Sequence, residues 1–563
     1  MRRIRETTAL LIGLGVSSFI GCAGDITGSG GPDGLEVPGV AGGPGDTSLD
    51  GSRTAFACDE AGERSTVRPL RRLSYWELTG SIERAFGENV LAAVEVPLES
   101  VQREGDTLNE GAFEQNTNRE YLEAILRVFD AVGETVEAER SLERFHGCDS
   151  LDSSACREAL VAGLGRRLFR RPLTDAQLLH FMQVLNEQGQ RGLVVAMMLA
   201  PEFLFHLEDG DGPEVELDQF ALASRLAFMI EDAIPDEPLL ALAEAGALEG
   251  EVLRDEVSRL LRGARGRAKT TTFFERWLGV RVVPAADTTE AFLRGIDGES
   301  YVAEAAEELR RFVDYVVYEK EGTVADLLLG NESFATSEDL AEVLGAQPWN
   351  EGDEPQEAAI ARGVLLRPPV LMNGYARTSP ILRGVFLLRN VLCEELEFPG
   401  DDVISMREEQ NPDPTAVTGR EITVAQTSAP ECAACHDAIN PLGFAFEDLD
   451  SLGRFRTQED HFVEGELVES YAIDSASTIT IDGNSVDVSG SLELVDALAA
   501  SDQVAACIAR RYYTFAQFRT DLDNADQCHT ARMFETLDGS GTILDLLHSA
   551  YLETILRTRR VNP

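Results

Sequence analysis

The stretch that most constrains this 563-residue chain is Cys432-Ala433-Ala434-Cys435-His436. Two thiols three residues apart can each add to a vinyl group of the same porphyrin, and a histidine directly after them can bind the iron. The spacing is typical of c-type haem attachment. It predicts one covalent haem held by Cys432 and Cys435, with His436 as the iron ligand.

Two other uses of this pattern stay open at the level of the sequence. A Cys-x-x-Cys-His run can be half of a zinc site, and a Cys-x-x-Cys pair can form a disulfide. A zinc site needs further ligands, and the sequence has no second Cys-x-x-Cys and no Cys/His pair at zinc-finger spacing. Haem is therefore favoured over structural zinc or a simple disulfide.

The N-terminus reads as an export signal. A basic start, Met1–Arg5, is followed by an apolar run from Thr8 to Phe19 and then by Ile20-Gly21-Cys22. This order resembles a bacterial lipoprotein signal and predicts lipidation of Cys22, although Phe19 leaves an ordinary signal peptide possible. We expect an outer-membrane lipoprotein that faces the periplasm or cell surface and meets the membrane through its N-terminal lipid alone.

The charge balance excludes one class of partner. The formal net charge is −49, from 98 acidic and 49 basic residues. Nucleic acid and anionic lipid surfaces repel such a chain, so no nucleic-acid partner is expected. A solvated acidic surface is the simplest interpretation of this charge.

The remaining cysteines predict disulfides, because an exported protein matures in an oxidising compartment. Two pairs flank short polar or helical segments and are expected to bond: Cys148 with Cys156, and Cys507 with Cys528. Elimination would then pair the two cysteines left over, Cys58 with Cys393.

Helical periodicity dominates the chain from Val67 onward. Ser74 with Glu77, and Thr174 with Gln177, have the spacing of capping boxes at helix starts. A long helix is predicted over 118–145, with one apolar face made of Leu122, Ile125, Leu126, Phe129 and Val132.

A short β-hairpin is the predicted exception. Ser477–Ile481 alternates apolar and polar residues, Asp482-Gly483 favours a tight turn, and Val486–Val488 returns. The expected fold is therefore mainly α: a multi-domain helical array with a cytochrome-c-like haem segment and this hairpin. The expected parts are a signal peptide (1–22), a Gly-rich flexible linker (23–56), an N-terminal helical domain (57–145), a small helical domain with the Arg-Arg-Pro-Leu motif (146–212), a central helical domain (213–350), the cytochrome-c-like domain (351–465), and the hairpin with a C-terminal helical domain (466–563).

Several ordered motifs give the chain a family resemblance. These motifs are Arg71–Leu78, Arg170–Thr174, Ala200–Leu204, Ala223–Leu226, Arg362–Leu365, Thr378–Gly384, Cys432–His436 with Asn440–Phe444, and Asp450 with Gly453–Arg456. In carrying them, the chain resembles the large exported cytochrome-c-like proteins of planctomycetes and myxobacteria, which are built from serial domains of unknown function. The family more often has Asp where this chain has Asn440. The resemblance implies the serial architecture and a haem, but no settled reaction.

Other residues near the motif are candidates for holding the haem. The second ring nitrogen of His436 should donate to a carbonyl, and that of Pro441 is the candidate by position. Arg454 and Arg456 suit the propionates as fork donors, with surface salt bridges as the alternative. Apolar cover is expected from Phe444, Phe446 and Phe455. No distal ligand stands out among the nearest candidates, Met372, Met406, His461, His529, Met533 and His548.

Two function classes follow. The first is a lipid-anchored haem protein that transfers electrons to or from an unidentified redox partner, or does haem-dependent redox chemistry at the cell envelope. The second is an envelope structural or interaction protein whose haem site is structural or vestigial. Without a distal ligand, the iron would be five-coordinate and open to peroxide or oxygen.

Overall fold

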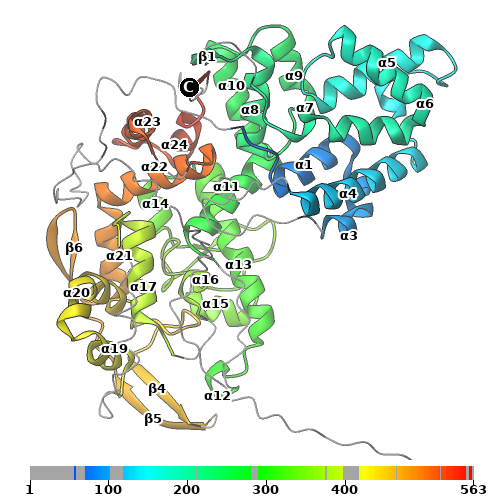
Figure 1. The fold of residues 1–563 in the computed structure, drawn as a ribbon. Coiled ribbons are helices and arrows are strands. Elements are labelled where there is room, and N and C mark those ends of the chain that lie inside the picture. Colours follow the sequence, from blue (N-terminus) through cyan, green and yellow to red (C-terminus); the bar gives the residue numbers. More distant parts are fainter. Residues whose placement is uncertain are drawn as a thin grey trace, which may run out of the picture. The chain divides into compact units, whose positions relative to one another are not determined.

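The computed structural model is mainly helical, as predicted, with a few short antiparallel strand pairs (Figure 1). It describes residues 56, 58, 70–99, 101, 118–208, 214–280, 290–373, 377–396, 417–463, 466–519, 522–552 and 557–560. The predicted signal peptide, Cys22, the Gly-rich linker except its last residue, Phe56, and Met406 lie outside the described residues. Among the residues that the structure describes, no helix is long and apolar enough to cross a membrane. The predicted domain boundaries stay predictions.

The helices between residues 75 and 204 pack around one hydrophobic cluster. The hydroxyls of Ser74 and Thr174 accept the backbone N–H groups of Glu77 and Gln177, whose side chains accept in return, so both predicted capping boxes form. The segments are α1 (Tyr75–Phe86), α2 (Glu88–Ala93), α3 (Glu95–Leu98), α4 (Arg119–Ala138), the 3₁₀ turn η3 (Glu143–Phe145), α5 (Ser154–Leu168), α6 (Asp175–Leu199) and α7 (Pro201–Leu204).

Helix α4 is shorter than the helix predicted over 118–145. Asn118 caps its start, and the chain leaves the helix after Ala138 because Arg140 takes a left-handed conformation at φ 57°. The predicted apolar face is correct for Ile125, Phe129 and Val132, which are fully buried. It is wrong for two leucines on the solvent side of the helix, which are 45% and 47% exposed: Leu122 and Leu126.

A second and larger cluster joins segments that are far apart in sequence, from α8 to α24. Its aromatic centre, Phe273, Phe274 and Trp277, is buried on one helix and reaches Tyr512, whose ring lies 5.0 Å from that of Phe273. These aromatic residues are therefore part of the core. The first helices of this part are α8 (Gln219–Glu231), α9 (Glu237–Glu244), α10 (Gly250–Arg262), α11 (Ala264–Trp277), α12 (Glu290–Leu293), α13 (Gly298–Asp314), the π-helical turn η4 (Tyr315–Glu319), α14 (Val324–Leu329) and α15 (Glu338–Leu344).

The helices that follow surround the Cys-x-x-Cys-His stretch and complete the C-terminal part. They are α16 (Pro368–Leu371), α17 (Pro380–Phe386), the π-helical turn η5 (Leu387–Val391), α19 (Gly419–Thr427), α20 (Pro430–Phe444), α21 (Ser491–Ala499), α22 (Asp502–Gln517), α23 (Asn524–Glu535) and α24 (Ile543–Ser549). Helix α20 carries the motif and packs against α17, α19 and β6 (Figure 1).

The described strands form four two-stranded antiparallel sheets. The predicted hairpin is β6 (Ser477–Ile481) with β7 (Asn484–Val488), and its turn residues Asp482 and Gly483 have φ values of 52° and 71°. Positive φ at both positions is what a type I′ turn requires. The other three pairs were not predicted: β1 (Glu214–Glu216) with β8 (Thr558–Arg560), β2 (Glu332–Ser333) with β3 (Gln356–Glu357), and β4 (Gln458–Val463) with β5 (Glu466–Ala472).

The described residues form three disulfides, two of which join distant parts of the chain. Cys148 bonds to Cys156, the pair that the sequence predicts. The other two predicted pairings are wrong, since the actual bonds are Cys58–Cys528 and Cys393–Cys507. Helix α22 packs Cys507 against the end of η5, where its Cα lies 5.4 Å from that of Cys393, so proximity in space overrides proximity in sequence.

Candidate functional site

Helix α20 presents both thiols of the motif. Proline at the first helical position is compatible with a helix start because it needs no N–H partner there. Cys432 and Cys435 are one turn apart, so they lie on neighbouring parts of one helix face. Both are partly exposed and free, whereas every other described cysteine is in a disulfide. The helix therefore offers two reduced, accessible sulfurs about one turn apart.

The imidazole of His436 is held by a side chain one turn further along α20. Its Nδ1 lies 3.0 Å from Oδ1 of Asn440, which is buried. The amide Nδ2 of Asn440 donates to the hydroxyl of Thr427 at 2.8 Å, and that hydroxyl donates to the carbonyl of Thr423 at 2.8 Å. A relay of three hydrogen bonds thus runs from α19 to the ring.

The predicted partner of His436, the carbonyl of Pro441, is wrong. That carbonyl accepts the backbone N–H of Ala445 at 3.2 Å and so stays in the helical hydrogen-bond pattern. Residues four apart are neighbours on a helix, which brings Asn440 rather than Pro441 to the ring of His436. The i, i+4 spacing of His436 and Asn440 was the signal in the sequence that could have found it.

Two glycines set the position of α20. A Cβ added to Gly443 would lie 1.9 Å from the carbonyl oxygen of Pro380, and one added to Gly384 would lie 2.1 Å from that of Ile439. The backbones of α17 and α20 are therefore in direct contact, and glycine is what allows it. This contact fixes the helix that carries the thiols and the histidine.

Arg383 secures the chain just after α20. It is buried on α17, and its guanidinium donates to the carbonyls of Phe446, Leu449 and Asp450 at 2.8 to 2.9 Å. Burial lowers the pKa of Arg383 to about 10, and the nearby Glu447 acts in the opposite direction. Arginine can satisfy several carbonyls at once because its donors form a rigid fork.

The two predicted propionate ligands lie in ion pairs of their own. Arg454 donates to Asp450 at 2.6 Å, and Arg456 donates to Glu447 at 3.0 Å. The alternative of salt bridges is thus what the structure has, although both pairs are largely buried rather than on the surface. Their use by a haem stays a prediction.

The aromatic residues after the motif divide between core and surface. Phe444 and Phe446 are buried, whereas Phe455 is 53% exposed. Two aliphatic side chains on the helices that pack against α20 are similarly exposed: Leu382 on α17, at 53%, and Val424 on α19, at 48%. Exposed apolar surface therefore exists on two of the helices that pack against the motif helix.

The described candidates for a distal haem ligand are each buried in the core or in contact with other side chains. His529 and Met533 are fully buried on α23. The ring of His548 lies 2.9 Å from the hydroxyl of Ser258, the ring of His461 contacts the guanidinium of Arg377, and Met372 packs against a small hydrophobic cluster. The structure thus singles out none of them.

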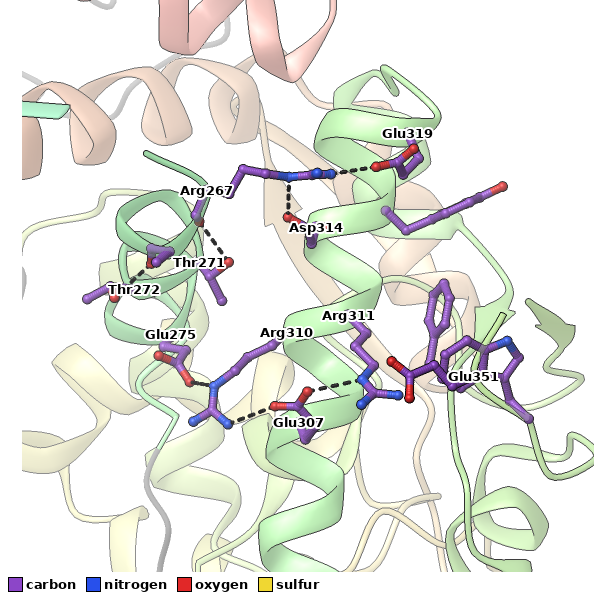
Figure 2. Close-up of a pocket in the computed structure, with 14 residues that line it drawn as sticks. Arg267, Thr271, Thr272, Glu275, Glu307, Arg310, Arg311, Asp314, Glu319 and Glu351 are labelled. Atoms are coloured by element: carbon purple, nitrogen blue, oxygen red, sulfur yellow. Dashed lines mark hydrogen bonds and ion pairs between the residues drawn. The ribbon is translucent and has the colours of Figure 1, made fainter. Parts of the chain in front are cut away.

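A groove of about 640 Å³ between α11 and α13 is the other candidate site (Figure 2). Arg310 reaches across it to Glu275 at 2.6 Å, and Arg267 reaches Asp314 at 2.9 Å. The third arginine of the groove, Arg311, pairs with Glu307 on its own helix. Figure 2 shows the pairs of Arg310 with Glu275 and of Arg267 with Asp314 joining the two walls of the groove.

Two acidic residues just after the end of α20 have shifted pKa values. Burial raises the pKa values of Glu447 and Asp448, which the nearby arginine and serine groups partly offset. Each has one carboxylate oxygen that is buried without a hydrogen bond: Oε1 of Glu447 and Oδ1 of Asp448. No group of three His, Cys, Asp or Glu side chains among the described residues is arranged to hold a metal ion.

Comparison with known families divides the chain into serial parts. Residues 217–345 match the family described as PSD4, a protein of unknown function (DUF1592). Residues 361–459 match the family described as PSCyt3, also a protein of unknown function (DUF1588), and this stretch includes α17, α19 and α20. No curated protein and no solved structure matches the chain. The chain therefore carries serial domains of unknown function.

Proposed function

We propose that this is an exported c-type haem protein with one haem bound covalently to Cys432 and Cys435. The observation that carries the proposal is the donor set on α20: two free thiols about one turn apart, followed by a histidine whose Nδ1 is already hydrogen-bonded. Its Nε2 then remains for the iron. The match to a family named PSCyt3 over this segment agrees with the resemblance to exported cytochrome-c-like proteins.

The donor set fits the chemistry of attachment. Each thiol would add across one vinyl group of the haem: one sulfur–carbon bond would form, the thiol hydrogen would go to the neighbouring carbon, and there would be no leaving group. The reaction needs both sulfurs reduced and accessible, as they are in Cys432 and Cys435. A disulfide between these two would have blocked it.

The surroundings fit an apolar ring. Leu382 and Val424, exposed on the two helices beside α20, are surface that a porphyrin could cover, and burying apolar area is favourable at about 25 cal/mol per Å². A bound haem would supply one-electron redox chemistry. The chain's own part is to hold the ring through the two sulfurs and to orient the imidazole through Asn440.

The location belongs to the same proposal. Three disulfides are consistent with an exported protein, because such bonds form and persist outside the reducing cytosol. The N-terminal sequence supports a lipid on Cys22 and an outer-membrane position facing the periplasm or surface. The redox partner would then be another envelope component, and nucleic acid is disfavoured by the net charge of −49.

The test is haem retention after export. The mature protein, made in a host with haem-attachment machinery, should give a c-type pyridine haemochrome spectrum and keep its haem through acid–acetone extraction. The double variant Cys432→Ala, Cys435→Ala should lose that haem. Wild-type protein that is exported but free of haem, or that holds zinc, would leave the envelope interaction protein as the function to pursue.

A matched control is available in the same chain. The double variant Cys148→Ser, Cys156→Ser also removes two cysteines, but from a disulfide on the N-terminal helices. It should keep its haem in full. Equal loss in both double variants would mean that cysteine removal impairs folding, and that the thiols of α20 have no special part.

A further inference from the structure

The relay behind His436 determines more than the position of the ring. Among the described residues, it is made of three buried groups from two helices: the carbonyl of Thr423 and the hydroxyl of Thr427 on α19, and the amide of Asn440 on α20. Each of these groups has a fixed number of protons. Their order along the relay therefore sets which nitrogen of His436 carries a proton.

The proton count starts at Thr427. A threonine within a helix commonly donates its one hydroxyl hydrogen to the carbonyl four residues earlier, and Thr427 does so to Thr423. Its oxygen must then accept from Asn440, which turns the NH₂ group of the amide toward Thr427 and the amide oxygen toward His436. A carbonyl oxygen accepts, so Nδ1 of His436 must be the protonated nitrogen.

We infer that Asn440 is a positioning residue that holds His436 with a proton on Nδ1, so that Nε2 is the nitrogen offered to a haem iron, and that its uncharged amide keeps this ligand a weaker electron donor than a carboxylate partner would. This inference rests on the proposed haem function and deepens it. The protonated Nδ1 leaves Nε2 as the nitrogen with a free lone pair. The relay therefore pre-organises the nitrogen that faces away from α19 as a metal ligand.

The neutrality of Asn440 sets the electronic character of the ligand. A carboxylate at this place would attract the Nδ1 proton and make the ring a stronger electron donor, which favours oxidised iron. An amide accepts the same hydrogen bond without charge and has no proton to gain or lose in the ordinary pH range. With Asn440, the ring would donate more weakly, and the reduced state of a bound iron would be favoured.

Asn440→Asp provides the main test in the haem-bearing protein. It should retain the thioether-bound haem and lower the midpoint potential by at least about 59 mV, which is a tenfold change in a one-electron reduction equilibrium. Thr427→Val keeps the side-chain shape but removes the hydroxyl, so it should shift the potential by a smaller amount. An unchanged potential in both variants would overturn the inference.

The matched control is Thr423→Val. Thr423 lies one turn before Thr427 on the same helix, and it contributes its backbone carbonyl to the relay. This variant should therefore leave the potential unchanged. A shift as large as that of Thr427→Val would mean that the packing of α19, and not the hydrogen-bond relay, sets the properties of His436.

A second readout needs no haem. Long-range ¹⁵N–¹H spectra of full-length protein with labelled histidine, made without attachment machinery, should place the proton of His436 on Nδ1, and Thr427→Val should shift the population toward Nε2–H. A wild-type Nε2–H tautomer contradicts the relay. If wild-type protein lacks haem under attaching conditions yet shows the Nδ1–H tautomer, the proposed function fails while the relay stands.

Discussion

The motif helix α20 and the groove between α11 and α13 differ in whether their functional side chains have bonding partners. In the groove, each of the three arginines is paired with at least one carboxylate, and two of them bridge the helices. On α20, two thiols stay free, and the described residues offer Nε2 of His436 no hydrogen bond, while Nδ1 is held firmly. Side chains that are fully paired within the protein stabilise its structure. A functional site instead needs reactive side chains that have no partner within the protein and that are held in place by a rigid element.

The interactions that hold the groove and α20 in place also differ. The groove is framed by partly exposed ion pairs, which contribute little to stability individually. Helix α20 is fixed by backbone contact at two glycines and by a buried arginine. We therefore expect substitutions around α20 to cost far more than substitutions in the groove.

The largest effect is expected from Arg383→Met. It removes a buried cation from three carbonyls and from Glu447, which is left as a buried charge with one partner fewer. Losing one partner of a buried pair costs about 3–5 kcal/mol. Urea unfolding of the purified variant measures this loss, and a cost below 1 kcal/mol would contradict the role given to Arg383.

Gly443→Ala should have the next largest effect. The added methyl would meet the carbonyl of Pro380, so α17 and α20 must move apart, at a cost of about 1–3 kcal/mol. The exposed Ala438→Val on the same helix is the control and should stay within about 0.5 kcal/mol of wild type. Equal stabilities of the two variants by urea unfolding would show that the helices are not in close contact.

Asp448→Asn should change how stability depends on pH, with a smaller effect than the first two variants because an amide oxygen keeps the bonds from Ser491. The folded-state pKa of Asp448 lies above its unfolded value, since burial disfavours the charge. Folded protein then binds the proton more tightly, so this group lowers stability as pH rises through the interval above the unfolded pKa. The variant should gain stability relative to wild type between acidic and neutral pH, measured by urea unfolding at each pH. A constant difference would argue against a raised pKa.

The smallest effect is expected in the groove. Glu307→Gln removes its pairs with Arg310 and Arg311, both partly exposed, and should cost about 0–1 kcal/mol. Haem content measured by pyridine haemochrome should equal that of wild type. If this variant lost haem while Gly443→Ala kept it, the contrast between the two regions would be reversed.

Features that depend on residues close together in the sequence could be predicted, whereas features that depend on distant residues could not. The capping boxes at Ser74 and Thr174 and the turn at Asp482-Gly483 were predictable, because each is decided within a few residues. The bond from His436 to Asn440 is equally local, because the two residues are one helical turn apart, and the predicted partner, the carbonyl of Pro441, was wrong because α20 continues through Pro441.

Long-range features were beyond the sequence. The partners of Cys393 and Cys528 are 114 and 470 residues away, and pairing along the chain gave the wrong bonds. The contact of Gly443 with Pro380 and the relay to Thr427 likewise depend on how three helices pack. Helical periodicity shows that a face is buried, but not what lies against it.

Intact mass spectrometry of the mature wild-type protein, unfolded but not reduced, tests the central claim most directly. A c-type haem on α20 predicts the mass of the polypeptide with any N-terminal lipid, plus one haem, with three disulfides and no thiol left to alkylate. The contradicting result is a mass without haem, in which Cys432 and Cys435 either take up two alkyl groups or form a fourth disulfide.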